Sequence, residues 1–128
     1  TGPNLHKVSN EQVARERDLI DQIKKVIAHE KLYRNSNLTV RMLAENLNSQ
    51  EYLVRRAINN HMGYRNFSEF LNHYRIDETI ELLVGTNEPI TNIGFDVGYT
   101  SLSSFYKAFK ILNNTTPKEY RAHHKPKI

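Results

Sequence analysis

Apolar residues recur at helical spacing along most of this chain, and polar residues fill the positions between them. The first such pattern covers about Ser9 to Lys31, and its opening residues, Ser9 to Gln12, have the form of a capping box. We therefore expect a long helix there, preceded by a tail of residues 1–8. The helix either packs on the core or couples the chain to a domain outside it. Its apolar stripe consists of Val13, Ile20, Ile23, Val26 and Ile27.

Two shorter helices with a tight turn between them are predicted next. After a polar loop from Leu32 to Asn37, Thr39 caps a short helix. Asn48-Ser49 then forms a turn, because Asn tolerates a left-handed backbone and Ser caps helices. The following helix runs from about Gln50 to Met62. It stops at Gly63, as a glycine just past a helix end should make it do.

The same succession returns after one long helix. An apolar pattern predicts that long helix over residues 67–84. Pro89 then precedes a short helix, a position where proline is tolerated, and Gly98 makes the turn. A helix from about Ser101 to Leu112 follows, and Pro117 opens a last short helix. No stretch alternates as a strand does, so the predicted fold class is all-α with about seven helices.

Each pair of a short helix and a longer helix forms a helix-turn-helix, in which the second, or recognition, helix lies in the major groove of DNA. The domains we expect are a first helix-turn-helix subdomain at 9–65, a connecting helix at 66–85, a second subdomain at 86–122 and a basic tail at 123–128. The two copies form a weak internal duplication. Its corresponding positions are Ala44, Gln50, Val54, Ile58, Gly63 and Phe67 in the first copy and Gly94, Ser101, Phe105, Phe109, Asn114 and Tyr120 in the second.

The length of the connecting helix suits two adjacent groove segments. Major-groove faces on one side of B-DNA repeat about every 34 Å. A helix of about 20 residues is about 30 Å long. One chain with both subdomains therefore needs no second copy to fill two successive groove segments.

Charge supports a polyanionic partner. The net charge is +4 and the isoelectric point is about 9.4. Residues 107–127 contain six Lys and Arg residues against Glu119 alone, whereas residues 66–100 contain six carboxylates against Arg75 alone. This segregation predicts a DNA-facing side and a side that faces elsewhere. The chain has no cysteine, as is common in a reducing cytoplasm, and no apolar run reaches the roughly 20 residues of a membrane span.

No arrangement of residues indicates an enzyme, a cofactor or a metal site. The six histidines lack ligand spacing, and the chain has no Gly-rich phosphate loop, G-x-S-x-G or H-E-x-x-H motif. Carboxylates such as Asp77 and Glu81 fit a solvated helix face. Four aromatic residues have the spacing of core residues rather than of a stacking platform for single strands: Phe95, Phe105, Phe109 and Tyr120.

From Leu38 to Arg121 the chain resembles the DNA-binding domain of the AraC/XylS family of bacterial transcription regulators. PITNIGFDVGYTSLSSFYKAFK and the later TPKEYR are similar to the family signature almost position for position. NHYRIDETIELL resembles the family's linker helix, and LTVRMLAENLNSQEYLVRRAINNHMGYRNFSEFL resembles its first helix-turn-helix.

Four positions depart from the family pattern. Gly94 replaces the usual alanine, which costs the helix about 1 kcal/mol at most. Asn114 replaces the usual glycine and still permits a left-handed cap. Ile58 replaces the usual phenylalanine. Gln50 occupies a position where the family has a small or capping residue, so the sequence defines the start of the first recognition helix only to within one residue.

The resemblance implies seven helices in two subdomains, groove binding as a monomer and transcription regulation, usually activation. Base contacts carried over by position fall to Tyr52, Arg55 and Arg56 in the first unit, where Arg is suited to guanine. In the second unit they fall to Ser103, Tyr106 and Lys107. The alternative to a base contact for Arg56 is an ion pair, and the alternative to a phosphate contact for Ser101 is an N-cap. The predicted phosphate contacts are Thr100, Ser101, Lys110 and Arg121.

We therefore expect a cytoplasmic bacterial activator that binds an asymmetric site in double-stranded DNA. A repressor with the same binding mode is an alternative. Another is a protein-interaction module, whose acidic stretch from Glu69 to Glu88 meets a partner. RNA polymerase is a further expected partner. Many family members also carry a ligand-binding or dimerisation domain, and a chain that opens on Thr1 without an initiator Met favours a fragment of such a protein.

Overall fold

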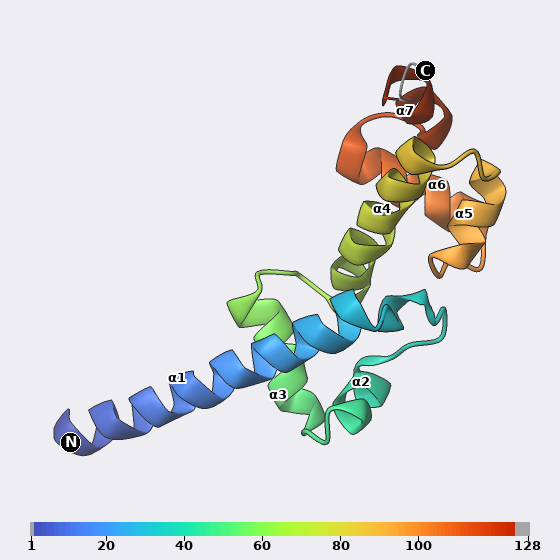
Figure 1. Ribbon diagram of the computed structural model, residues 1–128. Coiled ribbons are helices and arrows are strands. Elements are labelled where there is room, and N and C mark those ends of the chain that lie inside the picture. The colour runs from blue at the N-terminus through green and yellow to red at the C-terminus, as the bar shows by residue number, and fades with distance from the viewer. Residues whose placement is uncertain (1, 125–128) are drawn as a thin grey trace. The chain divides into compact units, whose positions relative to one another are not determined.

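The computed structural model describes residues 2–124, and the side chains of residues 10–124. Every regular element in that range is helical, which confirms the all-α class with seven α-helices (Figure 1). Shorter turns lie at Lys25–His29 and Ala57–His61, both π-helical, and at Leu32–Arg34. The α-helices are α1 (Gly2–Lys24), α2 (Val40–Asn46), α3 (Glu51–Arg56), α4 (Phe67–Gly85), α5 (Ile90–Asp96), α6 (Leu102–Asn113) and α7 (Pro117–His124).

The chain folds into two compact units. The first consists of the chain up to Lys31 together with Leu38–Phe67, and the second consists of Leu32–Asn37 together with the chain from Ser68 onward. The short segment Leu32–Asn37 therefore packs with the second unit, although it precedes α2 in the sequence. Lys125 and Lys127 of the expected basic tail lie outside the described residues.

In the first unit, local signals fix the helix ends as predicted. Thr39 caps α2, because its Oγ1 accepts a hydrogen bond from the Met42 amide at 3.1 Å. Asn48 and Gly63 take positive φ values of 55° and 83°, which turn the chain after α2 and after the recognition helix. The core residues come from α1, α2, α3 and the two π turns: Ile23, Ile27, Val40, Leu43, Ala44, Val54, Ala57 and Ile58.

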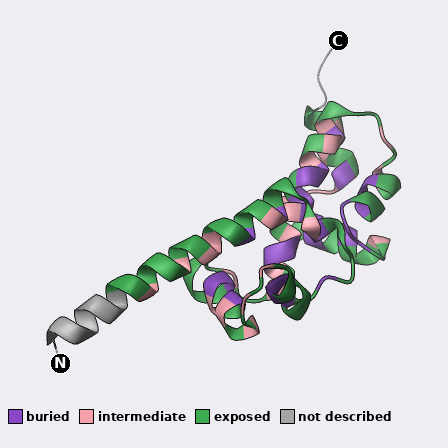
Figure 2. Ribbon diagram, turned by 60° about the horizontal axis from the view of Figure 1, so that its bottom comes forward, coloured by how far each residue is buried: buried purple, intermediate pink, exposed green. Residues whose placement is uncertain are grey.

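Helix α1 differs from the prediction at its start. It begins at Gly2, so the expected capping box at Ser9 is wrong, because a residue in the middle of a helix has no free helix terminus to cap. Among its side chains from residue 10 onward, burial is confined to the C-terminal part, at Ile23 and, in the π turn that follows, Ile27 (Figure 2). Val13, expected in the apolar stripe, is 46% exposed.

In the second unit, α4 to α7 surround one core cluster. Ser101 caps α6 by accepting a hydrogen bond from the Ser104 amide at 3.1 Å, and Asn114 ends α6 with a left-handed φ of 57°. At α7, the Thr116 hydroxyl accepts a hydrogen bond from the Glu119 amide at 3.1 Å and donates one to the Glu119 carboxylate at 2.9 Å, an N-cap that the sequence did not predict. The cluster consists of Ile76, Leu83, Ile93, Val97, Tyr99, Phe105, Ala108 and Phe109, with Tyr120 packed against it.

Two residues of α5 correct the sequence interpretation. Phe95 was expected in the core, but it is 50% exposed. Ile93 and Val97 take the inward positions four residues apart, and Phe95 lies about 200° round the helix from each. A Cβ on Gly94 would lie 2.6 Å from Cδ2 of Phe105, so this glycine lets the Phe105 ring approach the backbone of α5. Its role is close packing, which the propensity argument alone did not reveal.

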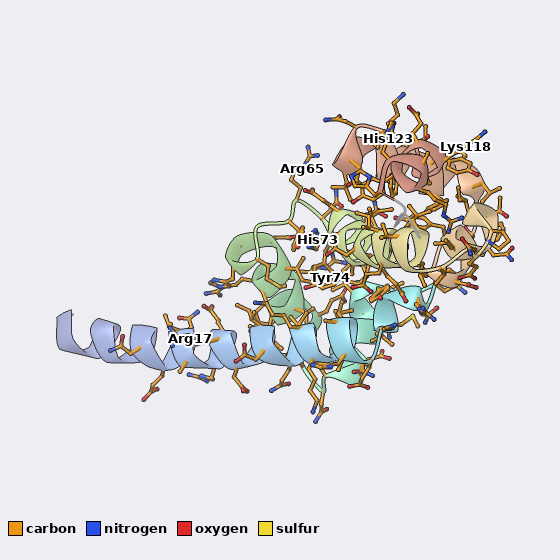
Figure 3. All side chains as sticks on the ribbon, turned by 45° about the horizontal axis from the view of Figure 1, so that its top comes forward. Arg17, Arg65, His73, Tyr74, Lys118 and His123 are labelled. Atoms are coloured by element: carbon orange, nitrogen blue, oxygen red, sulfur yellow. The ribbon has the colours of Figure 1, made fainter. Side chains whose placement is uncertain are left out.

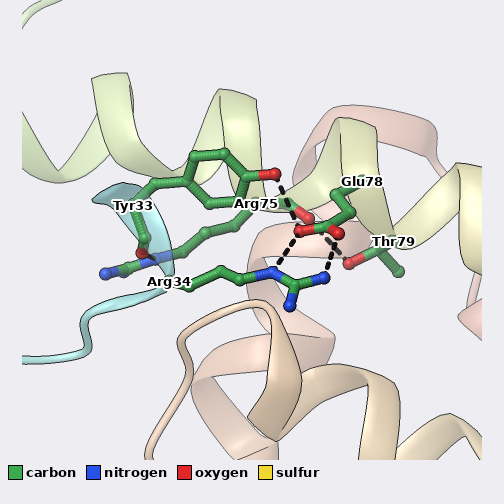
Figure 4. A network of polar contacts seen from close by, with 5 residues as sticks. All are labelled: Tyr33, Arg34, Arg75, Glu78 and Thr79. Atoms are coloured by element: carbon green, nitrogen blue, oxygen red, sulfur yellow. Dashed lines mark hydrogen bonds and ion pairs between the residues drawn. The ribbon is translucent and has the colours of Figure 1, made fainter. Parts of the chain in front are cut away.

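A buried polar network ties the segment Leu32–Asn37 to α4 (Figure 4). Glu78 is 4% exposed, accepts a hydrogen bond from Tyr33 Oη at 2.7 Å and pairs with the guanidinium of Arg34. Arg75 donates from Nε to the Tyr33 carbonyl at 2.8 Å and from a terminal nitrogen to the Asn35 carbonyl at 3.1 Å. Burial lowers the pKa of Arg75 and, together with the bond to Glu78, raises the pKa of Tyr33.

Candidate DNA-binding surface

The first recognition helix presents its predicted residues outward. Val54, Ala57 and Ile58 face the core at positions i, i+3 and i+4, so the opposite side of α3 faces solvent. Tyr52 lies there and is 63% exposed. The side chains of Arg55 and Arg56 are 57% and 40% exposed. Helix α3 therefore brings together an aromatic ring and two guanidinium groups on one accessible surface.

The two arginines of α3 have different carboxylate partners. Arg55 approaches Glu51, one turn earlier on the same helix, at 2.9 Å in an exposed pair of a kind that contributes little stability. Arg56 reaches across to α1, where a terminal nitrogen lies 2.7 Å from Oε1 of Glu16, whose side chain is 15% exposed. The ion pair considered as an alternative for Arg56 is thus present. The base contact of Arg56 stays a prediction.

In the second unit, α6 also exposes its predicted residues. Phe105, Ala108 and Phe109 are buried, which leaves Ser103, Tyr106, Lys107 and Lys110 on the exposed side. The Tyr106 ring lies 5.4 Å from that of Phe105, centroid to centroid, and is therefore partly held by the core. Lys107 lines a polar hollow of about 380 Å³ together with Ser104, Thr100 and Ser36.

The start of α6 gives Ser101 a structural role. Its hydroxyl caps the helix and also donates to the hydroxyl of Ser104 at 3.0 Å. Thr100, the neighbouring predicted phosphate contact, is exposed. The cap that was weighed as an alternative for Ser101 is present, and contact of either hydroxyl with a phosphate stays a prediction.

Arg121 is placed apart from the other predicted residues. From α7 its Nε donates to the Leu83 carbonyl at 3.0 Å, and a terminal nitrogen lies 3.4 Å from the Thr86 carbonyl. A guanidinium there satisfies carbonyls that the end of α4 leaves without helical partners, and it suits the negative end of the helix dipole. Its expected phosphate contact remains untested.

Basic side chains outside the predicted set are exposed in each unit, and the acidic stretch is less uniform than its sequence suggests. Arg17 on α1 and Lys118 and His123 on α7 are exposed (Figure 3). Within the acidic stretch from Glu69 to Glu88, by contrast, Glu78 is buried in the network with Arg34 and so does not form part of an exposed acidic surface. Sequence reasoning missed both Glu16 and Glu78, because their partners lie 40 or more residues away.

Two helix-turn-helix units with exposed second helices define a DNA-binding protein. A family model described as a helix-turn-helix domain matches residues 43–123. The chain belongs to this family, the AraC-type helix-turn-helix proteins, and contains their DNA-binding domain. The family and fold are those of DNA-binding transcription regulators.

One similar curated protein is an uncharacterized HTH-type transcriptional regulator of Staphylococcus aureus strain MSSA476. It is 31% identical over 101 residues, which cover 79% of this chain and 13% of the relative. The chain thus spans about an eighth of that relative's length. Within residues 2–124, no helix combines the length and the apolar character that crossing a membrane requires.

Two solved structures are similar throughout most of the chain. The C-terminal domain of AraT, a response regulator from Geobacillus stearothermophilus, has 30% identity and a TM-score of 0.74, with 84% of this chain and 87% of that chain covered. The C-terminal domain of the two-component response regulator yesN from Fusobacterium nucleatum has 26% identity and a TM-score of 0.70, with 81% and 98% covered.

Proposed function

We propose that this regulator is a transcription activator that binds an asymmetric site in double-stranded DNA and places α3 and α6 in adjacent major-groove segments. The observation that carries the proposal is the exposed set Tyr52, Arg55 and Arg56 on α3. A guanidinium forms two parallel hydrogen bonds with O6 and N7 of guanine. The family resemblance supports the choice of activator over repressor, which would use the same DNA contacts.

We further propose different roles for the two recognition helices. On α3, Arg55 and Arg56 contact base edges, and Tyr52 contacts a phosphate or a thymine methyl group. On α6, the shorter polar groups of Ser103 and Tyr106 and the point charge of Lys107 suit phosphates more than paired base contacts. Thr100, Ser101, Lys110 and Arg121 are assigned to the DNA backbone, where each contact adds affinity without sequence preference.

The alternative of a protein-interaction module receives less support. It requires the acidic stretch from Glu69 to Glu88 to meet a partner, yet Glu78 is turned inward. The cations exposed on α3 and α6 suit a polyanion instead. In the cytoplasm of a bacterium, the partners we propose are duplex DNA, RNA polymerase and a signalling or dimerisation domain of the same polypeptide. The two response-regulator neighbours support that last partner.

Selection from a library of random DNA duplexes, scored at two salt concentrations, tests the proposed function. The expected result is an asymmetric site with two elements about one helical turn apart. Affinity should fall steeply with salt, because each neutralised phosphate adds close to one unit to the slope. Weak binding without sequence preference would contradict the proposal.

A further inference from the structure

The Glu16 carboxylate on α1 contacts two residues of the first recognition helix, Arg56 and His61, and has no role in the proposed function. Oε1 of Glu16 lies 2.7 Å from a terminal nitrogen of Arg56, and Oε2 lies 2.9 Å from Nε2 of His61. The contact with Arg56 is a charge contact without the alignment of a hydrogen bond. Each carboxylate oxygen thus has its own partner, and the carboxylate is itself held in place.

The backbone of the recognition helix makes this double contact possible. In an α-helix, residues five apart lie about 140° apart, on different sides. After Arg56, however, the helix continues as a π turn from Ala57 to His61, which closes with a hydrogen bond from the Met62 amide to the Ala57 carbonyl at 2.9 Å. The wider turn reduces the angular separation of Arg56 and His61, so one carboxylate reaches both.

Arg56 lies beside a hollow on its α1 side. It lines this hollow of about 280 Å³ between α1 and α3, together with Tyr52, Leu19 and Leu53. Packing against α1 is therefore incomplete at this point. The contact with Glu16 restrains a side chain that would otherwise sample several rotamers.

The pair leaves Arg56 able to bind DNA. A guanidinium has five N–H donors, and Glu16 approaches only one terminal nitrogen. The remaining donors are available for a base edge. Ordering a side chain before binding removes the entropy cost of ordering it in the complex, and this gain applies most to contacts that demand one geometry. A base edge demands such a geometry, whereas random DNA offers phosphates in many positions.

We propose that Glu16 is a positioning residue that acts through Arg56 and raises the preference of this regulator for its cognate site. This inference rests on the proposed base contact of Arg56. Glu16 touches no base. Its negative charge also repels DNA phosphates weakly, and this repulsion lowers affinity equally for cognate and random duplexes.

The test measures the ratio of affinities for two duplexes of equal length, the best one recovered by selection and a random one. Glu16→Gln should lower this ratio about two- to tenfold, with binding to the random duplex unchanged or stronger. Glu16→Asp keeps the charge but shortens the reach, so it should lower the ratio without changing the salt slope. Glu11→Gln removes the same charge from an exposed position on the same helix, so the ratio should stay unchanged.

A double-mutant cycle separates positioning from a general structural effect. In a chain that carries Arg56→Ala, the added Glu16→Gln change should leave the ratio where Arg56→Ala alone puts it. Far-ultraviolet circular dichroism and thermal unfolding of each variant confirm that the compared proteins are folded. If Glu16→Gln does not fold, Glu16→Asp and the same cycle built on it decide the question.

The outcomes distinguish this inference from the proposed function. If selection yields no site, or Arg56→Ala leaves the ratio unchanged, the proposed role of Arg56 fails and this inference fails with it. If Arg56→Ala lowers the ratio while Glu16→Gln and Glu16→Asp do not, Arg56 keeps its role and the positioning role of Glu16 is overturned. A drop in the ratio that persists in the Arg56→Ala background overturns it too.

Discussion

Helix α3 of the first unit and helix α6 of the second occupy equivalent places in their helix-turn-helix motifs, but they differ in structure and in chemistry. Helix α6 is regular over 12 residues, with a side-chain cap at Ser101 and a left-handed end at Asn114. Helix α3 has no side-chain cap at Gln50 and widens into a π turn. The predicted DNA-contacting groups of α3 are two guanidiniums and a phenol ring, whereas those of α6 are a serine hydroxyl, a phenol ring and two lysines, and α6 also exposes Ile111 and Leu112.

The comparison suggests a division of labour. Guanidinium groups contact base edges with two bonds, whereas lysine acts as a point charge. Helix α3 also receives support from α1 through Glu16, and α6 has no equivalent cross-helix ion pair among the interactions found for the described residues. We therefore expect α3 to supply most of the sequence preference and α6 to supply much of the general affinity.

The largest expected effect is on stability and concerns a glycine of the second unit. Gly98 has a φ of +122°, and a Cβ there would lie 2.7 Å from both Arg75 Nε and the Tyr33 carbonyl oxygen. Gly98→Ala should lower the free energy of unfolding by about 3 kcal/mol or more, because it combines strain with a clash against the buried network. Denaturant unfolding followed by circular dichroism measures this loss.

The control is another glycine with a positive φ, at the end of the recognition helix of the first unit. Gly63 has a φ of +83°, but a Cβ there meets nothing within 4 Å. Gly63→Ala should therefore cost only about 1–2 kcal/mol, the strain of the left-handed backbone. Equal losses for the two variants would contradict the view that the Arg75 network makes Gly98 the more demanding position.

A second prediction concerns the base preference of α3. Arg55→Ala should reduce preference for the cognate duplex by about 1–3 kcal/mol while non-specific binding persists. Arg55→Lys is the matched variant, since it keeps the charge but loses the planar fork. It should lose cognate preference and retain affinity for random DNA. Titrations of both duplexes provide the measurement, and parallel losses on the two duplexes after Arg55→Ala would rule out the base contact.

The smallest effect concerns the general affinity supplied by α6. Lys110→Ala should weaken cognate and random DNA alike and flatten the dependence of log affinity on log salt by about one unit. Lys24→Ala, an exposed lysine at the end of α1, serves as the control and should leave the slope nearly unchanged. Fluorescence anisotropy over a salt series gives both quantities. A loss confined to the cognate duplex would show that Lys110 contacts a base.

The elements that the sequence predicted correctly depend on local chemistry. Thr39, Asn48, Gly63 and Asn114 each fix a helix end through their own backbone or through neighbours within four residues, so one stretch of sequence contains the whole signal. The all-α class followed from such signals together with helical periodicity.

The features that escaped prediction depend on residues far apart in the sequence. Glu78 is buried because Tyr33 and Arg34 reach it from a segment more than 40 residues away, and its own neighbours on α4 give no sign of this. Phe95 has the spacing of a core residue, yet Ile93 and Val97 fill the inward positions. The contact of Glu16 with Arg56 likewise depends on how α1 packs against α3 in the first unit.

Selection of binding sites with two double variants tests the division of labour most directly. Wild-type protein should recover two sequence elements about one helical turn apart. With Arg55→Ala and Arg56→Ala together, one element should disappear while the other persists. With Ser103→Ala and Tyr106→Ala together, the element read by α3 should persist, whereas the second, weaker element, which faces α6, should fade and overall affinity should fall. Recovery of both elements by the arginine variant would contradict the assignment of sequence preference to α3.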